Sequence, residues 1–291
     1  ERLLAFIGGK AESALLMDAF NILLEEDIFR TNPQALEKLN GWVKARDASR
    51  QPAAMYAMGS LLLEKDDLSG AVKMAEEGLS KYPQSLPVQI LSLNTITVLL
   101  DKNRLQDAER LISKYPGSSP DLVFQQGALA FLKKDYSLAQ KLFREAARRA
   151  SETTAENALF NENLAALNAN DASGAAALIK EAAGSSRLRE SILFEQAHYA
   201  AKRMAPQAAE LLANFITLAE TPALKTQARL DQVEVALNLN PPDLETVQAI
   251  LPLLEKEQLS PEQTMQLARL NILEAESRQT GVSGRQRRLV L

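Results

Sequence analysis

The sequence predicts an all-α fold, a right-handed α-solenoid in which about seven helix pairs stack in series. Composition is the first observation: hydrophobic residues make up 46% of the chain and aromatic residues only 5%. Alanine and leucine dominate, a mixture that favours packed helices over sheets. Spacing is the second observation. Gly127 follows Gly59 by 68 residues, and Ala139 follows Ala71 by the same 68. Since 68 is twice 34, the spacing predicts a helix–turn–helix unit that recurs about every 34 residues.

We expect residues 1–50 to form N-terminal capping helices. Residues 1–10 read as an irregular lead-in, and a helix over 11–29 follows because its apolar residues recur at helical spacing. Asn32 and Pro33 then open a second helix, since proline is tolerated in a first turn where its missing N–H is not needed.

Residues 51–151 contain three helix–turn–helix units. In the first unit, a helix leads into the polar turn 64–67, and Pro83 ends the second helix because proline cannot continue it. Ser119 and Pro120 are expected to cap and open the first helix of the third unit.

The middle unit is displaced in register. Ala108 lies 37 residues after Ala71 and 31 before Ala139. Relative to a spacing of 34, three residues are inserted before Ala108 and three are missing after it. The small residues at these positions, with Gly59 and Gly127, are expected to let the two helices of a pair approach closely.

The first and third units follow one residue pattern. The first reads Met55-x2-Met58-Gly59-x2-Leu62, Ala71-x3-Ala75 and Pro83, and the third reads Val123-x2-Gln126-Gly127-x2-Ala130 and Ala139-x3-Phe143. In these residues the chain resembles the tetratricopeptide repeat family, whose pattern is W-x2-L-G-x2-Y, A-x3-F and P. The resemblance covers residues 52–151 most closely, and Ser151 replaces the closing proline of the third unit.

Beyond residue 151 the helical pairs continue with a drifting period. We predict divergent pairs over 152–258, with these helices: 156–168 with 173–183, 187–203 with 206–220, and 222–238 with 242–256. Ser260 and Gln263 form a capping box that opens a C-terminal capping helix. A basic tail completes the segment 259–291. We expect all four segments to form one continuous superhelix.

The residue types argue against an enzyme. There is no cysteine, and His198 is the only histidine, so thiol catalysis and a histidine-pair metal site are excluded. A lone helical histidine is expected to be a packing or surface residue. Gly8-Gly9-Lys10 lacks the spacing of a phosphate-binding loop. We therefore expect no catalytic residue, cofactor or metal, although a glycosidase-type carboxylate pair stays open.

Charge argues against a nucleic-acid partner. The formal net charge is -4, from 33 basic and 37 acidic residues, which gives no general attraction to phosphate backbones. One repeat carries a basic cluster: Lys133, Lys134, Lys141, Arg144, Arg148 and Arg149. Because the cluster does not recur in other repeats, we interpret it as a solvated face or a patch for an acidic partner. An RNA-binding or regulatory solenoid is the alternative.

The resemblance implies a partner-binding groove, which in this family is lined by the first helix of each repeat. Carried over position by position, the groove residues are Ala53, Tyr56, Ser60, Leu63 and Glu64 in the first unit, Ile90, Leu93, Thr97, Leu100 and Asp101 in the second, and Asp121, Phe124, Ala128, Phe131 and Leu132 in the third. The lining is mostly apolar and suits an amphipathic helix or an extended peptide. The other interpretation is that Tyr56, Phe124 and Phe131 belong to the core.

Together these features predict a non-catalytic scaffold or adaptor that binds a protein or peptide partner. The absence of cysteine favours a periplasmic or cell-envelope location, within a larger bacterial cell-envelope or secretion assembly, over the cytoplasm. No window is apolar over the length of a membrane span. The chain opens at Glu1 without an initiator methionine, so we expect a soluble part of a longer protein, with any anchor lying outside these residues.

Overall fold

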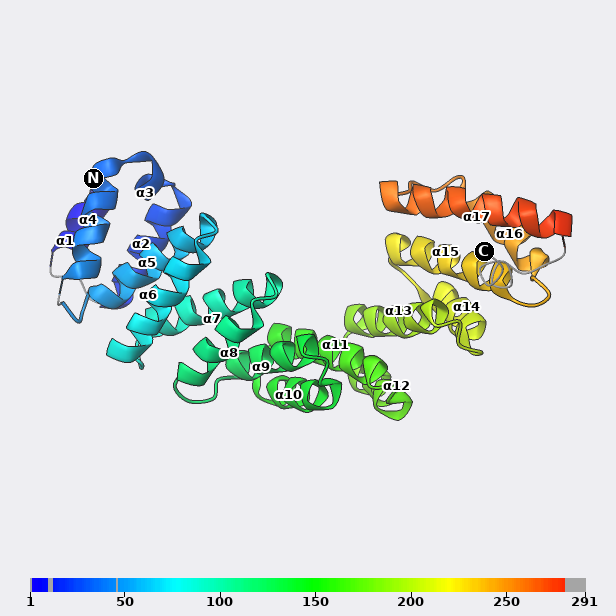
Figure 1. The fold of residues 1–291 in the computed structure, drawn as a ribbon, viewed down its shortest axis with the longest axis horizontal. Helices are drawn as coiled ribbons and strands as arrows, with labels where there is room; N and C mark the ends of the chain where they lie inside the picture. Colours follow the sequence, from blue (N-terminus) through cyan, green and yellow to red (C-terminus); the bar gives the residue numbers. More distant parts are fainter. Residues whose placement is uncertain (1, 10–12, 46, 281–291) are drawn as a thin grey trace. The chain divides into compact units, whose positions relative to one another are not determined.

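The computed structural model describes residues 2–9, 13–45 and 47–280, and these are helical or lie in the turns between helices (Figure 1). They form seventeen α-helices and one short 3₁₀ helix, and none of these described residues is in a β-strand. The all-α class expected from the composition is therefore confirmed.

The chain divides into two compact units, Glu1–Ala158 and Leu159–Leu291. The N-terminal unit contains α1 (Arg2–Gly8), α2 (Ser13–Glu25), α3 (Ile28–Thr31), α4 (Pro33–Lys44), α5 (Gln51–Glu64), α6 (Leu68–Lys81), α7 (Leu86–Asp101), α8 (Leu105–Lys114), α9 (Pro120–Leu132) and α10 (Tyr136–Arg149). The boundary falls within α11 (Glu152–Asn168). The C-terminal unit contains α12 (Ala172–Glu181), the 3₁₀ helix Ala182–Gly184, α13 (Ser186–Lys202), α14 (Ala208–Leu218), α15 (Pro222–Asn238), α16 (Leu244–Leu254) and α17 (Pro261–Thr280).

The N-terminal segment differs from the sequence prediction in two places. The prediction of an irregular lead-in is wrong for residues 2–8. They form α1 because Leu4 and Ile7 are buried in the N-terminal core cluster, which extends from α1 to α5. The single helix predicted over 11–29 is divided into α2 and α3. Asp27, with a φ of 54°, has a left-handed backbone conformation and separates them.

The helix starts read from the sequence are confirmed by their hydrogen bonds. The Asn32 side chain accepts from the backbone N–H groups two and three residues later, at 3.0 and 3.2 Å. Ser119 accepts from the N–H three residues later at 3.1 Å. Ser260 and Gln263 each accept the other's N–H, at 3.2 and 3.1 Å, which is a complete capping box.

One turn geometry joins the two helices of a pair, and it occurs five times in the described residues. Its central residue has a positive φ in each case: Asp66, Asn103, Lys134, Asn170 and Met204. The next residue's N–H bonds to the carbonyl five residues earlier at 2.7 to 2.9 Å, as in Asp67 to Leu62. This is the 6→1 bond of a Schellman motif, which satisfies carbonyls at the helix end.

The residue after the positive-φ position also starts the second helix in three of these turns. Asp67, Asp135 and Asp171 each accept a backbone N–H three residues later, at 2.9, 3.1 and 2.9 Å. The acids of the turn 64–67 are thus partly capping groups. One short sequence both closes a first helix and opens a second one.

Consecutive pairs pack through their first helices. In the N-terminal unit α7 packs against both α5 and α6 and also against α9. In the C-terminal unit α15 packs against α13 and α14 and also against α17. A buried core runs through α6, α7, α8 and α9 and includes Leu79, Leu91, Leu111 and Leu122.

Two glycines permit close approach between helices, with different partners. A Cβ on Gly127 would lie 2.9 Å from the ring of Phe143 on α10, the second helix of the same pair. A Cβ on Gly59 would overlap the methyl groups of Leu91, on the first helix of the next pair. The prediction of close approach within a pair is therefore right for Gly127 and wrong for Gly59, which faces the following repeat.

Polar contacts link residues about one repeat apart. The sequence separation is 33 to 35 residues in each of these contacts: Arg30 with Glu64, Glu76 with Arg110, Asn163 with Gln196, Asn170 with Arg203, His198 with Asp231, and Glu234 with Arg269. Contacts of this separation occur in both units. Among the described helices, none is long and apolar enough to cross a membrane.

Candidate functional site

The predicted groove residues lie on the three first helices of the N-terminal unit, here called the α5–α7–α9 surface. These residues are Tyr56, Ser60 and Leu63 on α5, Thr97 on α7, and Phe124, Ala128 and Phe131 on α9. Thr97 is exposed and the other six are half-buried. Each of the seven thus retains some surface that a partner could contact. The groove prediction is wrong for Ala53 and Leu100, which are buried in the core at 2% and 5% exposed.

Three of the predicted residues meet at one core. Tyr56, Leu63 and Ala128 pack half-buried against the buried cluster that runs through α6, α7, α8 and α9. Leu93, another predicted position, borders the same cluster. Apolar side chains of α5, α7 and α9 thus border one buried cluster.

The hydroxyl groups are already hydrogen-bonded. Ser60 Oγ donates to the carbonyl of Tyr56 on its own helix at 3.0 Å. Thr97 Oγ1 donates to the Leu93 carbonyl at 3.0 Å and accepts from Gln125 Nε2 at 2.8 Å. Gln125 thus links α9 to α7 at the exposed threonine, and the groove pattern did not single it out.

The two phenylalanines pack within their own pair. The Phe124 ring lies 5.3 Å from the Phe143 ring of α10, centroid to centroid, and Phe131 lies 5.3 Å from Tyr136 at the start of α10. Both rings remain half-buried, not fully buried. They therefore contribute to the packing of the pair and also to its surface.

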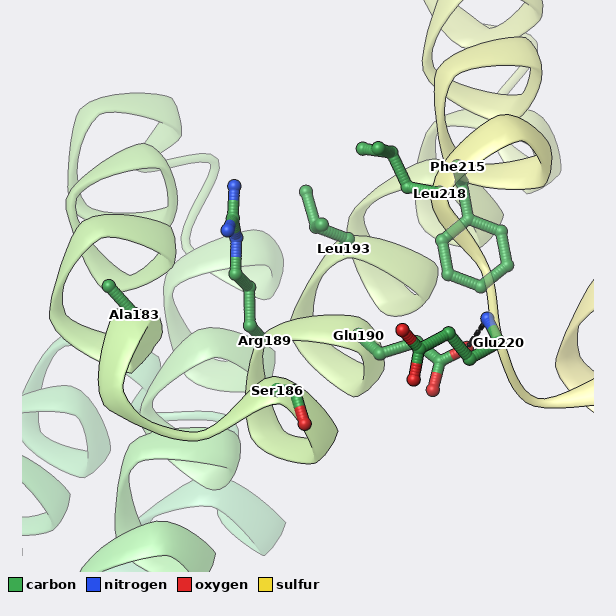
Figure 2. A pocket seen from close by; sticks show the side chains of 8 residues that line it. All are labelled: Ala183, Ser186, Arg189, Glu190, Leu193, Phe215, Leu218 and Glu220. Atoms are coloured by element: carbon green, nitrogen blue, oxygen red, sulfur yellow. Dashed lines mark hydrogen bonds between the residues drawn. The ribbon is translucent and has the colours of Figure 1, made fainter.

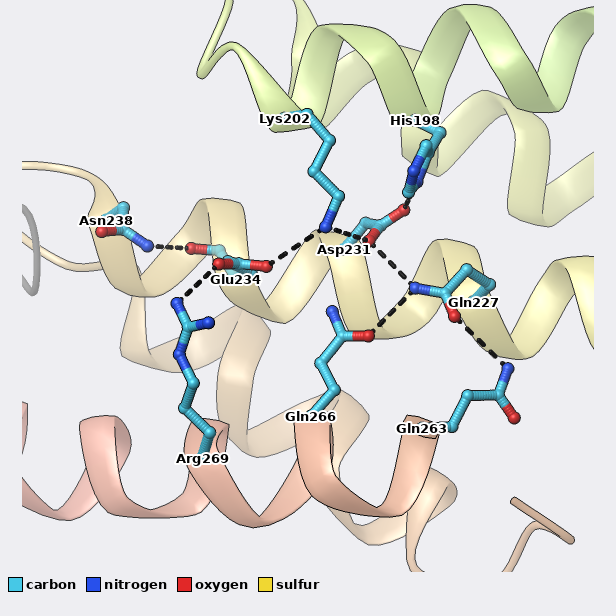
Figure 3. A network of polar contacts seen from close by, with 9 residues as sticks. All are labelled: His198, Lys202, Gln227, Asp231, Glu234, Asn238, Gln263, Gln266 and Arg269. Carbon is cyan, nitrogen blue, oxygen red and sulfur yellow. Dashed lines mark hydrogen bonds and ion pairs between the residues drawn. The ribbon is translucent and has the colours of Figure 1, made fainter. Parts of the chain in front are cut away.

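The C-terminal unit carries a polar counterpart on its first helices, here called the α13–α15–α17 network (Figure 3). At its centre Asp231, 2% exposed, faces His198, whose Nδ1 lies 2.5 Å from Asp231 Oδ2. The His198 ring also stacks on Phe194 at 5.4 Å. Burial of a carboxylate is tolerated because hydrogen-bonding and charged partners surround it.

Charged side chains extend the network along α15. Lys202 Nζ lies 4.0 Å from Asp231 and 3.9 Å from Glu234. Arg269 of α17 reaches Glu234 from the other side at 3.0 Å (Figure 3). Glu234 therefore bridges cations from two neighbouring first helices.

Three glutamines complete the connection between α15 and α17. Gln227 Nε2 donates to Asp231 at 3.2 Å and to Gln266 at 3.1 Å, and Gln263 donates to Gln227 at 3.4 Å. Gln266 Nε2 is buried and has no hydrogen-bond partner among the described residues. Figure 3 shows the polar line from His198 to α17 that these amides continue.

The network shifts two pKa values. The hydrogen bond to Asp231 raises the pKa of His198, and it outweighs burial, which acts in the opposite direction. Burial raises the pKa of Glu195, although the nearby His198 acts to lower it. The hydrogen bond thus favours the charged form of the His198 imidazole.

His198 is expected from the sequence to be a packing or surface residue, and its partner Asp231 was not predicted. Asp231 lies 33 residues further along, one repeat length, which is the signal that could have found it. The residue pattern used for the groove covered only 52–151, so it predicted nothing about α13, α15 or α17. The polar face of the C-terminal unit was therefore not expected.

A cavity of about 210 Å³ lies at the edge of α13 and α14 (Figure 2). Leu193, Phe215 and Leu218 form its apolar wall. Its carboxylate Glu190 accepts from the N–H groups of Glu220 and Thr221 at 2.8 and 2.7 Å. Burial acts to raise the pKa of Glu190, but these hydrogen bonds lower it overall. The carboxylate therefore serves to cap the start of α15.

The basic cluster of the third repeat is partly neutralised. Lys133 pairs with Glu109 at 2.7 Å, and Arg149 pairs with Glu145 at 2.8 Å and donates to Ser118. Two of its cations are thus engaged with acids of the same unit. No cluster of three or more metal-ligating side chains occurs among the described residues.

The comparisons with known proteins add no relative. No protein-family model matches the sequence, and no curated protein is similar to it. The resemblance to tetratricopeptide repeats therefore rests on the residues of 52–151 themselves.

Proposed function

We propose that the chain is a non-catalytic scaffold, a right-handed solenoid of tetratricopeptide-like pairs that binds a peptide or helix of a partner protein. The contacts between residues 33 to 35 apart and the recurring Schellman turn support the repeat arrangement. We place this role in a larger assembly of the bacterial cell envelope, where a chain without cysteine forms no stray disulfides.

One observation carries the binding proposal. Tyr56, Leu63, Leu93 and Ala128, from three successive first helices, are half-buried along a common core and keep an apolar surface. Thr97 adds an exposed hydroxyl beside them. Such a strip suits the apolar side of an amphipathic helix or the alternate side chains of an extended peptide. Aromatic side chains are frequent anchors at protein interfaces, which supports Tyr56 and Phe131 as contacts.

An RNA partner is the less supported alternative. The cluster that would attract phosphates has Lys133 and Arg149 in ion pairs with Glu109 and Glu145. Binding to RNA that falls steeply with added salt would favour this alternative.

The test is selection of peptides from a displayed random library by the 291-residue chain. Affinities of enriched peptides are then measured for Tyr56→Ala, Phe131→Ala and a matched control, Leu138→Ala. Leu138 is 46% exposed on α10, a second helix away from the proposed strip. We expect each of the first two substitutions to weaken binding by about tenfold or more, equivalent to about 1.4 kcal/mol. Leu138→Ala should leave the affinity unchanged.

Folding of each variant is checked by circular dichroism and thermal melting. The proposal fails if no peptide is enriched, or if enriched peptides bind the folded Tyr56→Ala and Phe131→Ala chains as well as the original chain.

A further inference from the structure

The last described helix, α17, is apolar on two opposite faces. Leu267 and Leu270 pack into the core that α15, α16 and α17 share. Met265 and Ile272 are 73% and 62% exposed, and Ala268 and Ala275 are also exposed. At about 100° per residue, Met265, Ala268, Ile272 and Ala275 fall within about 40° of one line along the helix. We call these four residues the α17 stripe.

In the C-terminal unit, α15 is also apolar on two faces. On α15, Ala228 and Val235 pack toward α13 and α14, while Leu230 and Val233 pack toward α16 and α17. One face of α15 is thus covered by the preceding pair, and the other by α16 and α17. On α17 the inward face is covered in the same way, but no described element covers the stripe. The stripe therefore continues the surface through which pairs stack, and it suits another helix.

The order of side chains along the stripe indicates which helix fits. Large and small residues alternate: methionine, alanine, isoleucine, alanine. If a second α17 lies antiparallel, with a twofold axis at the level of Leu270, Met265 lies opposite Ala275 of the second copy. Ala268 then lies opposite Ile272 of the second copy. Each large side chain meets a small one, which is the condition for dense helix packing.

A parallel pairing would be poorer. Met265 would lie opposite Met265 of the second copy, and each alanine opposite the same alanine. The large side chains would then crowd each other, and the alanines would leave gaps between the helices. The stripe itself carries no charge. Arg269 and Glu276 border it, and Arg269 is held by Glu234 at 3.0 Å. The antiparallel contact thus needs no unpaired charge to be buried.

From these observations we propose that the α17 stripe is a self-association surface, through which two copies of the chain form a twofold-symmetric antiparallel helix pair. A single pair of helices is near the small end of specific interfaces, below about 1,200 Å² in total. The dimer is therefore reversible and depends on concentration. This inference is independent of the groove on α5, α7 and α9.

Sedimentation equilibrium of the 291-residue chain tests association. The apparent mass should rise with concentration from 31.9 kDa toward twice that value. Ile272→Glu should keep the mass at 31.9 kDa throughout, because it places a charge in the centre of the contact. Leu218→Glu is the matched control: Leu218 is 63% exposed on α14, so this variant should dimerise like the original chain.

Disulfide cross-linking tests the antiparallel geometry, and the absence of cysteine in the chain makes the result unambiguous. A mixture of Met265→Cys and Ala275→Cys chains should form mixed disulfide dimers. Met265→Cys alone should not, since the two thiols would be about 15 Å apart, from ten residues at about 1.5 Å each.

Three results would overturn the proposal. The first is a mass that stays at 31.9 kDa at every concentration for the original chain. The second is dimerisation that survives Ile272→Glu. The third is an intramolecular disulfide in a monomeric Ile272→Cys/Val290→Cys chain, which would identify the segment 281–291 as the cover of the stripe.

Discussion

At the residue scale, the clearest constraint is the missing side chain of Gly59. Its backbone meets the buried side chain of Leu91 from the next repeat, so even one added methyl group must displace Leu91. Gly41 of α4 is different: a Cβ there would have no neighbour within 4 Å, so this glycine affects only helix propensity.

This contrast predicts opposite effects for the same substitution. Gly59→Ala should destabilise by about 1–3 kcal/mol from overpacking, reduced by up to about 1 kcal/mol of improved helix propensity. Gly41→Ala, the control, should stabilise by about 0.5–1 kcal/mol because only the propensity term applies. Urea unfolding measures both. Equal shifts in the two variants would show that Leu91 moves aside freely.

His198 predicts a measurable pKa difference, because it is the only histidine and its NMR signals need no assignment. Its titration midpoint should lie above the ordinary value of about 6.5, since the bond to Asp231 favours the charged imidazole. Asp231→Asn should lower the midpoint. Lys202→Gln should raise it further, because Lys202 acts to lower the pKa of His198. A midpoint that Asp231→Asn leaves unchanged would contradict the pairing.

The same shift gives the sign of the pH dependence of stability. A pKa that is higher in the folded than in the unfolded state stabilises the fold fully below about 6.5, the unfolded value. That contribution is lost as the pH rises through the folded-state value. Comparing urea midpoints of the original chain and His198→Asn across pH 5 to about 9 isolates it, with the difference expected to shrink toward high pH.

At the element scale, the recurring feature is the turn that closes a first helix and opens a second. Each turn requires a left-handed residue, and in the five described turns that residue is not glycine. Asparagine and aspartate tolerate the conformation through local hydrogen bonds, but lysine and methionine have no such compensation. This is why the turns could be predicted as polar breaks but not as a single shared geometry.

Lys134, with a φ of 64°, is therefore expected to store backbone strain. Lys134→Gly should stabilise the chain by about 1 kcal/mol, because glycine adopts this conformation without a Cβ clash. Lys134→Ala is the control, since it removes the same side chain but keeps a Cβ. It should give no comparable gain in the urea midpoint. If both variants behave alike, the side chain and not the backbone is responsible.

At the scale of the whole molecule, stability is expected to be local, because each pair packs mainly on its neighbours. Two natural reporters divide the chain: Trp42, the only tryptophan, packs in the N-terminal core cluster, and His198 lies in the C-terminal unit. Their signals report the unfolding of each compact unit separately.

Leu91→Ala, at a fully buried site of the N-terminal unit, should cost about 2–5 kcal/mol. We expect it to lower the urea midpoint reported by Trp42 fluorescence and to leave the midpoint reported by His198 signals nearly unchanged. The reciprocal control is Leu230→Ala, buried in the C-terminal unit, which should act on His198 and not on Trp42. Coincident shifts of both reporters would mean that the two units unfold together.

The sequence by itself determined the helical class and most helix starts. These depend on neighbours along the chain: Asn32, Ser119 and the Ser260–Gln263 box cap helices through bonds to residues two or three positions away. Periodicity could likewise assign α15 to its observed residues, because a buried helical face repeats locally.

Only the tertiary structure decided which side chains meet across pairs. It brought Asp231 to His198, turned Gly59 toward Leu91 of the next repeat, and packed Phe124 on Phe143 while leaving Met265 and Ile272 exposed. The physical reason is that a helical pattern fixes which residues share a face, whereas the neighbour that covers the face is set by packing between helices.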